Sequence, residues 1–178
     1  MARGHRGAEA VSSAAALAAI LIAIALQTTL GGLVFRGSTA IDLVLIAVVL
    51  VAIKSGPVTG LLAGTVAGLL QDALSGGVLG IGGMAKTIVG FLAGVLGRQF
   101  IVTAPLPRFV VLLMATGLHA AMFMGLYTLL NLRQFPSPYT AVVGQAFANA
   151  LVGVMAVTLI EWLPGLVDRH RVGRILKR

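Results

Sequence analysis

The chain has 178 residues, of which 58% are hydrophobic and only 10% are charged, and its formal net charge is +8. Soluble domains carry about 25% charged residues, so a chain this apolar has too little polar surface to cover a water-soluble globule. The absence of cysteine excludes disulfides, thiolate metal sites and cysteine nucleophiles. The basic residues lie at the ends of apolar runs, which is typical of membrane topology and argues against a nucleic-acid-binding face.

Apolar runs predict a polytopic bundle of six transmembrane helices in one domain, residues 1–163, because a span needs about 20 mostly apolar residues. The first run follows Arg3 and Arg6, as in a cleavable signal, but its length and the further runs favour a retained helix. The second run is the weakest, because it is short and contains Asp42 near its start. The predicted helices are 10–30, 39–53, 57–74, 78–96, 109–130 and 139–163.

The positive-inside rule supports six helices with both termini in the cytoplasm. This arrangement places ten basic residues inside and two, Arg36 and Arg133, outside, with Lys86 within a helix. A five-helix arrangement would put one basic terminus outside. The basic tail, 164–178, is expected to anchor the topology on anionic lipid, and docking of a cytoplasmic partner is the alternative.

Glycines recur at every fourth position along two consecutive predicted helices, and residues four apart share one helix face. In lipid, helices associate by close packing, so small residues mark contacts. A short glycine-rich turn joins the two helices, which therefore should form an antiparallel hairpin with these stripes in contact. The stripes are Gly56, Gly60, Gly64 and Gly68 in the first helix, and Gly90 and Gly94 in the second.

Two charged residues extend the same stripes, Asp72 in the first helix and Lys86 in the second. An Asp72–Lys86 ion pair at the outer end is within reach, because a lysine side chain can extend toward the interface. Alternatively, Asp72 lies in the headgroup layer and Lys86 reaches the interface alone. A proton or ion pathway is the third interpretation, since intramembrane ionisable residues are candidates for function.

Polar residues also mark the last two predicted helices. Gln145 and Asn149 lie between Ala141 and Gly153 at a spacing of four, which predicts a small and polar face that hydrogen-bonds another helix. A substrate pocket on this face is the alternative. His119 is expected to be a packing residue, because no second histidine or carboxylate accompanies it at metal-ligand spacing. The chain also shows no nucleophile with an adjacent base and no phosphate-binding loop, so we predict no catalytic, cofactor-binding or metal site.

The stretch GLLQDALSGGVLG at 68–80 resembles the signature of MreD, the family of bacterial rod shape-determining membrane proteins. The segments SGPVTGLLAG at 55–64 and KTIVGF at 86–91 are also similar to that family, as are the helix count and the chain length. In the family a proline often precedes the aspartate at the start of the second helix. Here Ile41 takes its place before Asp42, which leaves the role of Asp42 less certain than that of Asp72.

The resemblance implies a non-enzymatic scaffold or regulator of the elongation complex, which supports lateral peptidoglycan synthesis and rod shape in the bacterial inner membrane. The implied partners are membrane lipids, an MreC-like protein, a RodA-like glycosyltransferase with its penicillin-binding transpeptidase and, as a further candidate, the actin-like MreB; no nucleic acid is implied.

The family is also similar to the six-helix substrate-binding subunits of ECF vitamin transporters. The alternative function is therefore a small-molecule uptake subunit, with Ala15, Ala19 and Ala23 as its docking face. This alternative requires an outward pocket with several converging polar groups.

Overall fold

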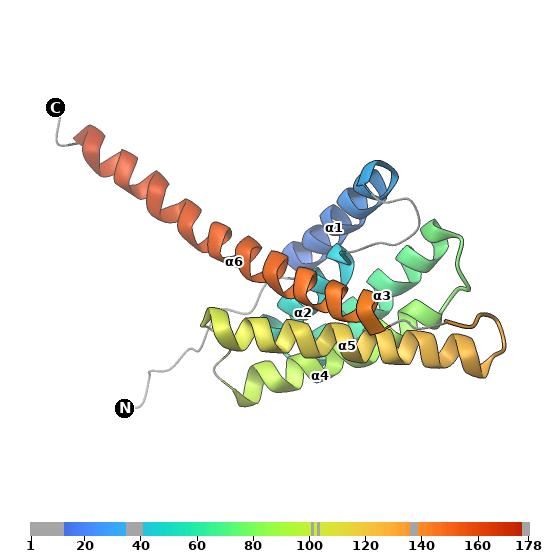
Figure 1. The fold of residues 1–178 in the computed structure, drawn as a ribbon. Coiled ribbons are helices and arrows are strands. Elements are labelled where there is room, and N and C mark those ends of the chain that lie inside the picture. The colour runs from blue at the N-terminus through green and yellow to red at the C-terminus, as the bar shows by residue number, and fades with distance from the viewer. Residues whose placement is uncertain (1–12, 35–40, 101, 103, 136–138, 176–178) are drawn as a thin grey trace.

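The computed structural model describes residues 13–34, 41–100, 102, 104–135 and 139–175, and these form six α-helices without a strand (Figure 1). The all-helical prediction is therefore confirmed. The predicted helix residues 10–12 and 39–40 lie outside the described residues. The helices are α1 (Ser13–Val34), α2 (Leu43–Ser55), α3 (Pro57–Ser75), α4 (Ile81–Gln99), α5 (Pro105–Leu129) and α6 (Tyr139–Ile175).

Four of the described helices are long and apolar enough to cross a membrane, namely α3, α4, α5 and the segment Tyr139–Trp162 of α6. The stretch Ser13–Thr29 of α1 and the whole of α2 are shorter, although α1 as a helix runs for 22 residues. At 1.5 Å per residue, α2 is about 20 Å long, which is less than the roughly 30 Å of a bilayer's hydrocarbon core. The prediction of six helices is thus correct, and within the described residues four of them meet both the length and the hydropathy expected of a full span.

Three helix starts differ from prediction because of local backbone chemistry. Helix α2 begins at Leu43 rather than 39, because Asp42 is its N-cap. Helix α4 begins at Ile81 rather than 78, since Gly80 before it has a φ of 99°, a left-handed conformation that ends the preceding turn. Helix α5 begins at Pro105, within the predicted loop. A proline in the first turn costs little, because the N–H groups there have no intrahelical acceptor.

Helix α6 continues to Ile175, past the predicted end at 163. The predicted tail, 164–178, is therefore helical in its described part. The sequence ended the last apolar helix at 163, before Pro164, whereas the structure continues the helix through this proline. In Figure 1 this red end of α6 projects beyond the other helices.

The short helix α2 lies at the centre of the bundle and contacts each of the other five helices. Its side chains are buried around the whole circumference, with Val44, Val48 and Val49 fully inaccessible. Such a helix is apolar on every face because every face meets protein. Helices α3 and α4 pack against it as an antiparallel hairpin, and α5 pairs with α6.

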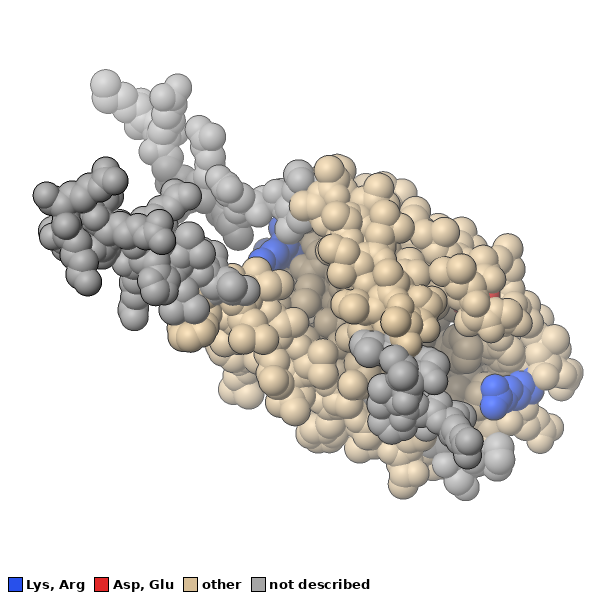
Figure 2. Space-filling model, turned by 90° about the horizontal axis from the view of Figure 1, so that it is seen from above, with Lys and Arg blue, Asp and Glu red and all other residues tan. Residues whose placement is uncertain are grey.

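The described surface is largely uncharged between the two ends of the molecule. In the view of Figure 2, Lys and Arg side chains gather at two places near opposite ends, with uncharged residues between them. Large apolar side chains such as Leu62, Phe147 and Leu151 are more than half exposed. This distribution agrees with the four helices of membrane-spanning length and with lipid as the solvent of the middle zone.

Candidate functional site: a buried polar cluster at the start of α2

Asp42 caps the N-terminus of α2 inside the bundle. Its Oδ1 accepts a hydrogen bond of 2.9 Å from the backbone N–H of Leu45, and its Oδ2 forms an ion pair of 2.9 Å with Lys86 Nζ. An N-terminal carboxylate satisfies a free N–H and interacts favourably with the helix dipole. Asp42 is 5% exposed and Lys86 3% exposed, so water does not solvate either charge.

His119 of α5 completes the charged part of the cluster. Its Nε2 lies 3.1 Å from Lys86 Nζ. An ammonium group only donates hydrogen bonds, so this ring nitrogen accepts one from Lys86. The imidazole also stacks on Phe123 at a centroid distance of 5.9 Å. Lys86 therefore joins α4 to α2 through a charge pair and to α5 through a hydrogen bond.

Asn149 of α6 holds the backbone at the same point. Its Oδ1 accepts a hydrogen bond of 2.8 Å from the Asp42 N–H, and its Nδ2 donates one of 3.2 Å to Thr116 Oγ1 on α5. The Thr116 hydroxyl donates in turn to the carbonyl of Leu112. Asn149 is fully buried and links three helices. Gln145, one turn earlier on α6, is half-buried.

Gln27 of α1 binds the backbone on both sides of Asp42. Its Nε2 donates to the carbonyl of Ile41 at 3.1 Å, and its Oε1 accepts from the N–H of Leu43 at 2.7 Å. The start of α2 is thus held by side chains from α1, α4 and α6. Groups that would be unsatisfied at a helix N-terminus in lipid find partners within the protein.

Asp72 and Lys86 do not form the predicted ion pair. Lys86 pairs with Asp42 instead, and Asp72 Oδ2 accepts hydrogen bonds from the N–H groups of Gly80 at 2.9 Å and Gly83 at 3.1 Å. The first N–H groups of α4 are free donors and lie directly opposite the end of α3. Asp72 therefore fixes the register of the hairpin through backbone donors rather than through a charge.

The glycine stripes lie at the closest approach of α3 and α4. A Cβ atom on Gly60 would collide with the backbone of Gly90, and one on Gly64 with the backbone of Lys86. Gly68 similarly faces the backbone of Gly83, and Gly94 lies against Gly56 and Pro57. Between these contacts the hydroxyls of Thr65 and Thr87 form a hydrogen bond of 2.8 Å.

A second ion pair joins α5 to α6 at the opposite end of the bundle. The Arg108 guanidinium binds both carboxylate oxygens of Glu161, at 3.2 and 2.8 Å, and its Nε donates to the carbonyl of Val102. The Glu161 side chain is 51% exposed. Arg108 is buried and only its partner is exposed, whereas both charges of the Asp42–Lys86 pair are buried.

Replacing Asn149 with alanine is expected to lower the free energy of unfolding by about 1–3 kcal/mol, because the buried N–H of Asp42 loses its acceptor. Gln134→Ala is the matched control, since Gln134 is an exposed amide and surface substitutions change stability by about 0.5 kcal/mol or less. Denaturation in detergent followed by circular dichroism measures both. Equal stabilities for the two variants would contradict the assigned role of Asn149.

A family model described as rod shape-determining protein MreD matches residues 12–168. The chain belongs to the MreD family. Comparison with curated proteins and with solved structures finds no match. Membership in the MreD family confirms the resemblance noted at residues 68–80, and it gives the protein a role in rod shape determination. With four helices of spanning length, this member of the MreD family is a membrane protein.

Proposed function

We propose that the protein is a non-enzymatic scaffold or regulator of the bacterial elongation complex, which supports lateral peptidoglycan synthesis. The observation that carries this proposal is the Asp42–Lys86 pair with its neighbours, because it holds the central α2 to the surrounding helices. A bundle fixed in this way keeps one shape and can present a constant outer surface to partner helices. We place it in the inner membrane with both termini cytoplasmic, as its charge distribution predicts.

The outer face of α6 is the contact surface that we propose for a partner helix. Large apolar side chains recur there at every fourth residue, so they form one continuous stripe. Each is between 54% and 57% exposed. Partners implied by the resemblance are an MreC-like protein, a RodA-like glycosyltransferase with its transpeptidase and MreB. The α6 stripe comprises Val143, Phe147, Leu151, Met155 and Leu159.

A photo-crosslinking amino acid at Leu151 tests this proposal in native membranes. We expect it to capture a cell-wall synthesis protein, identified by mass spectrometry. The same probe at Leu62 on α3, which is 58% exposed, is the matched control and should capture lipid or other proteins. If both positions crosslinked the same proteins, the α6 stripe would not be a specific contact surface. If the probe captured an ATPase pair and a transporter coupling subunit, the protein would be an uptake subunit and not a scaffold.

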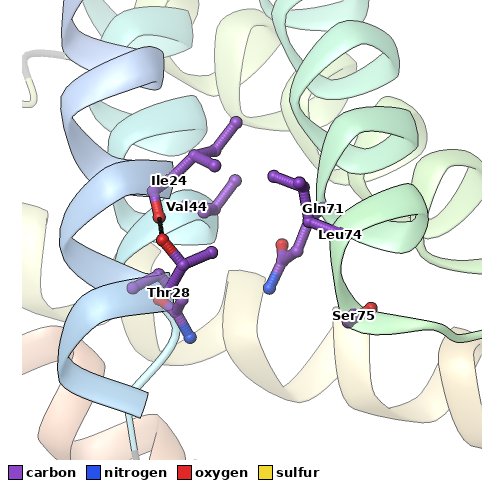
Figure 3. Close-up of a pocket in the computed structure, with 7 residues that line it drawn as sticks. Ile24, Thr28, Val44, Gln71, Leu74 and Ser75 are labelled. Atoms are coloured by element: carbon purple, nitrogen blue, oxygen red, sulfur yellow. Dashed lines mark hydrogen bonds between the residues drawn. The ribbon is translucent and has the colours of Figure 1, made fainter. Parts of the chain in front are cut away.

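The uptake-subunit alternative has less support. Two of its candidate pocket residues, Asp72 and Asn149, already hydrogen-bond within the bundle. Of the proposed docking face on α1, Ala15 and Ala19 are exposed, whereas Ala23 is 7% exposed and packs inward. Gln71 lines a cleft of about 270 Å³ (Figure 3), which is smaller than the roughly 300–1,000 Å³ of small-molecule pockets. We therefore keep the scaffold as the proposed function.

A further inference from the structure

Aromatic residues mark both ends of the membrane-spanning part of α6. The segment Tyr139–Trp162 has the length and hydropathy of a span, and its 24 residues measure about 35 Å at 1.5 Å per residue. Tyr139 and Trp162 are 79% and 63% exposed. Tyrosine and tryptophan are enriched where a membrane meets water. Trp162 therefore lies where α6 leaves the hydrocarbon layer.

Helix α6 does not end at this interface. It continues to Ile175, and Figure 1 shows this end of α6 projecting beyond the other helices. From Trp162 to Ile175 the helix advances by about 20 Å. A helix that continues a span in this way leaves the membrane surface, whereas a helix that binds a lipid surface lies in its plane.

The end of α6 is fixed to the bundle where it leaves the membrane. Glu161, one residue before Trp162, binds the Arg108 guanidinium of α5 through both carboxylate oxygens, at 3.2 and 2.8 Å. Arg108 is itself buried and also donates to the carbonyl of Val102. The base of the projecting helix is therefore held by two contacts of one buried side chain.

The projecting helix is basic. Its sequence holds Arg169, Arg171 and Arg174 against one carboxylate, Asp168. Along the helix axis these arginines lie about 10, 13 and 18 Å beyond Trp162. Attraction to anionic lipid falls off within a Debye length, which is about 8 Å at physiological salt. Anchoring on anionic lipid, which the sequence led us to expect of the basic tail, therefore fits this geometry less well than docking of a cytoplasmic partner.

The composition of the projecting helix favours a protein over a nucleic acid. Leu166, Val167, Val172 and Ile175 are interspersed with the basic residues. Protein interfaces combine apolar contacts with arginine, whereas proteins that bind single-stranded nucleic acid add aromatic side chains on which bases stack. The sequence contains no Phe, Tyr or Trp after Trp162.

We propose that the projecting helix, residues 163–175, is a docking site for an acidic surface of a cytoplasmic protein. Carboxylates of such a partner complement the three arginines, and its apolar residues contact the interspersed aliphatic ones. Because the helix is continuous with α6, it connects the partner to the membrane bundle. This inference rests on the cytoplasmic placement of the C-terminus proposed above.

Fluorescence quenching of the full chain in nanodiscs with phosphatidylglycerol tests whether this helix stands away from lipid. The natural chain has no cysteine, so Val172→Cys and Trp162→Cys each give one site for a fluorophore. We expect a quencher on the lipid headgroups to act severalfold less on position 172 than on position 162, the control at the interface. Equal quenching at both positions would mean that the tail lies on lipid, and would overturn the proposal.

The same cysteine reports the side of the membrane. A membrane-impermeant maleimide should label Val172→Cys only after the cells are opened. Labelling in intact cells would overturn the cytoplasmic placement and this proposal with it. The crosslinking result at Leu151 does not depend on the side, so failure here is distinguishable from failure of the scaffold function.

A photo-crosslinking amino acid at Val172 in native membranes tests the kind of partner. We expect capture of a cytoplasmic protein through a segment rich in Asp and Glu. Reversing the three charges, with Arg169→Glu, Arg171→Glu and Arg174→Glu, should lower the yield about tenfold or more, because like charges across an interface repel. Arg133→Glu, at an exposed arginine in the loop between α5 and α6, is the control and should keep the wild-type yield.

Crosslinks to RNA or to lipid alone, or a protein captured equally well by the reversed variant, would overturn the proposal. If charge reversal disturbs membrane insertion, the wild-type chain provides the same readout through salt. The yield at position 172 should fall as the salt concentration rises, since salt screens attraction between exposed charges. A yield independent of salt would exclude an acidic partner.

Discussion

Replacing Asp42 with asparagine is expected to lower the free energy of unfolding by about 3–5 kcal/mol. The change keeps the size of the side chain and an oxygen that can cap α2. It removes the negative charge that lies 2.9 Å from Lys86 Nζ. Lys86 is 3% exposed, so its ammonium would remain buried with only His119 as a neutral partner. An uncompensated buried charge is among the largest costs that a single substitution imposes.

The double variant Asp42→Asn with Lys86→Met separates the charge pair from the other contacts of the cluster. It removes both charges, and replacing a buried pair by uncharged groups is often close to neutral, so most of the lost stability should return. Lys54→Met, at an exposed lysine on the same α2 helix, should change stability by no more than about 0.5 kcal/mol. A double variant no more stable than Asp42→Asn would mean that the ion pair is not what holds α2.

The same variants connect stability to cell shape. Because α2 contacts each of the other helices, loss of its anchor should loosen the whole bundle and the α6 stripe with it. In a rod-shaped host depleted of its own family member, Asp42→Asn should give rounded cells, while Lys54→Met should restore rods. If both strains grew as rods at equal protein levels, the buried cluster would not be required for rod shape.

The sequence predicts the helices and one of their interfaces well, because both depend on local regularities. Apolar runs locate the six helices, and a spacing of four identifies the glycine faces of α3 and α4. The boundary errors have local causes as well. Gly80 and Pro105 have backbone conformations that decide where α4 and α5 begin, and an apolar run extends across such positions without a break.

The buried cluster was harder to predict, because its members are distant in the sequence. Asp42 and Asn149 are separated by 107 positions, and no periodicity connects them. A signal for Asp42 was nevertheless present, since a carboxylate directly before an apolar run is typical of a helix N-cap. The apolar run that follows Asp42 is short. The sequence therefore indicated a weak transmembrane span, and not a helix that begins inside the bundle. The expected Asp72–Lys86 pair failed because backbone N–H groups, which no side-chain pattern reveals, compete for Asp72.

Replacing Gly64 with leucine should cost about 3 kcal/mol or more and disrupt the α3–α4 hairpin. A Cβ atom at this position meets the backbone of Lys86 and Thr87, which cannot move aside as a flexible side chain can. The helices would have to separate, and overpacking of this kind commonly costs about 1–3 kcal/mol even where side chains can adjust. The shift would also displace Lys86, and with it the charge pair to Asp42.

Gly117→Leu on α5 is the matched control, because a Cβ atom there meets nothing within 4 Å. Leucine has a better helix propensity than glycine, so this variant should be neutral or gain up to about 1 kcal/mol. Denaturation in detergent compares the two, and Gly64→Ala should fall between them, since its single methyl group meets the same backbone. If Gly64→Leu matched Gly117→Leu, the glycine stripe would reflect composition rather than contact. If Gly64→Leu lost as much free energy of unfolding as Asp42→Asn, the hairpin and the buried cluster would behave as one cooperative unit.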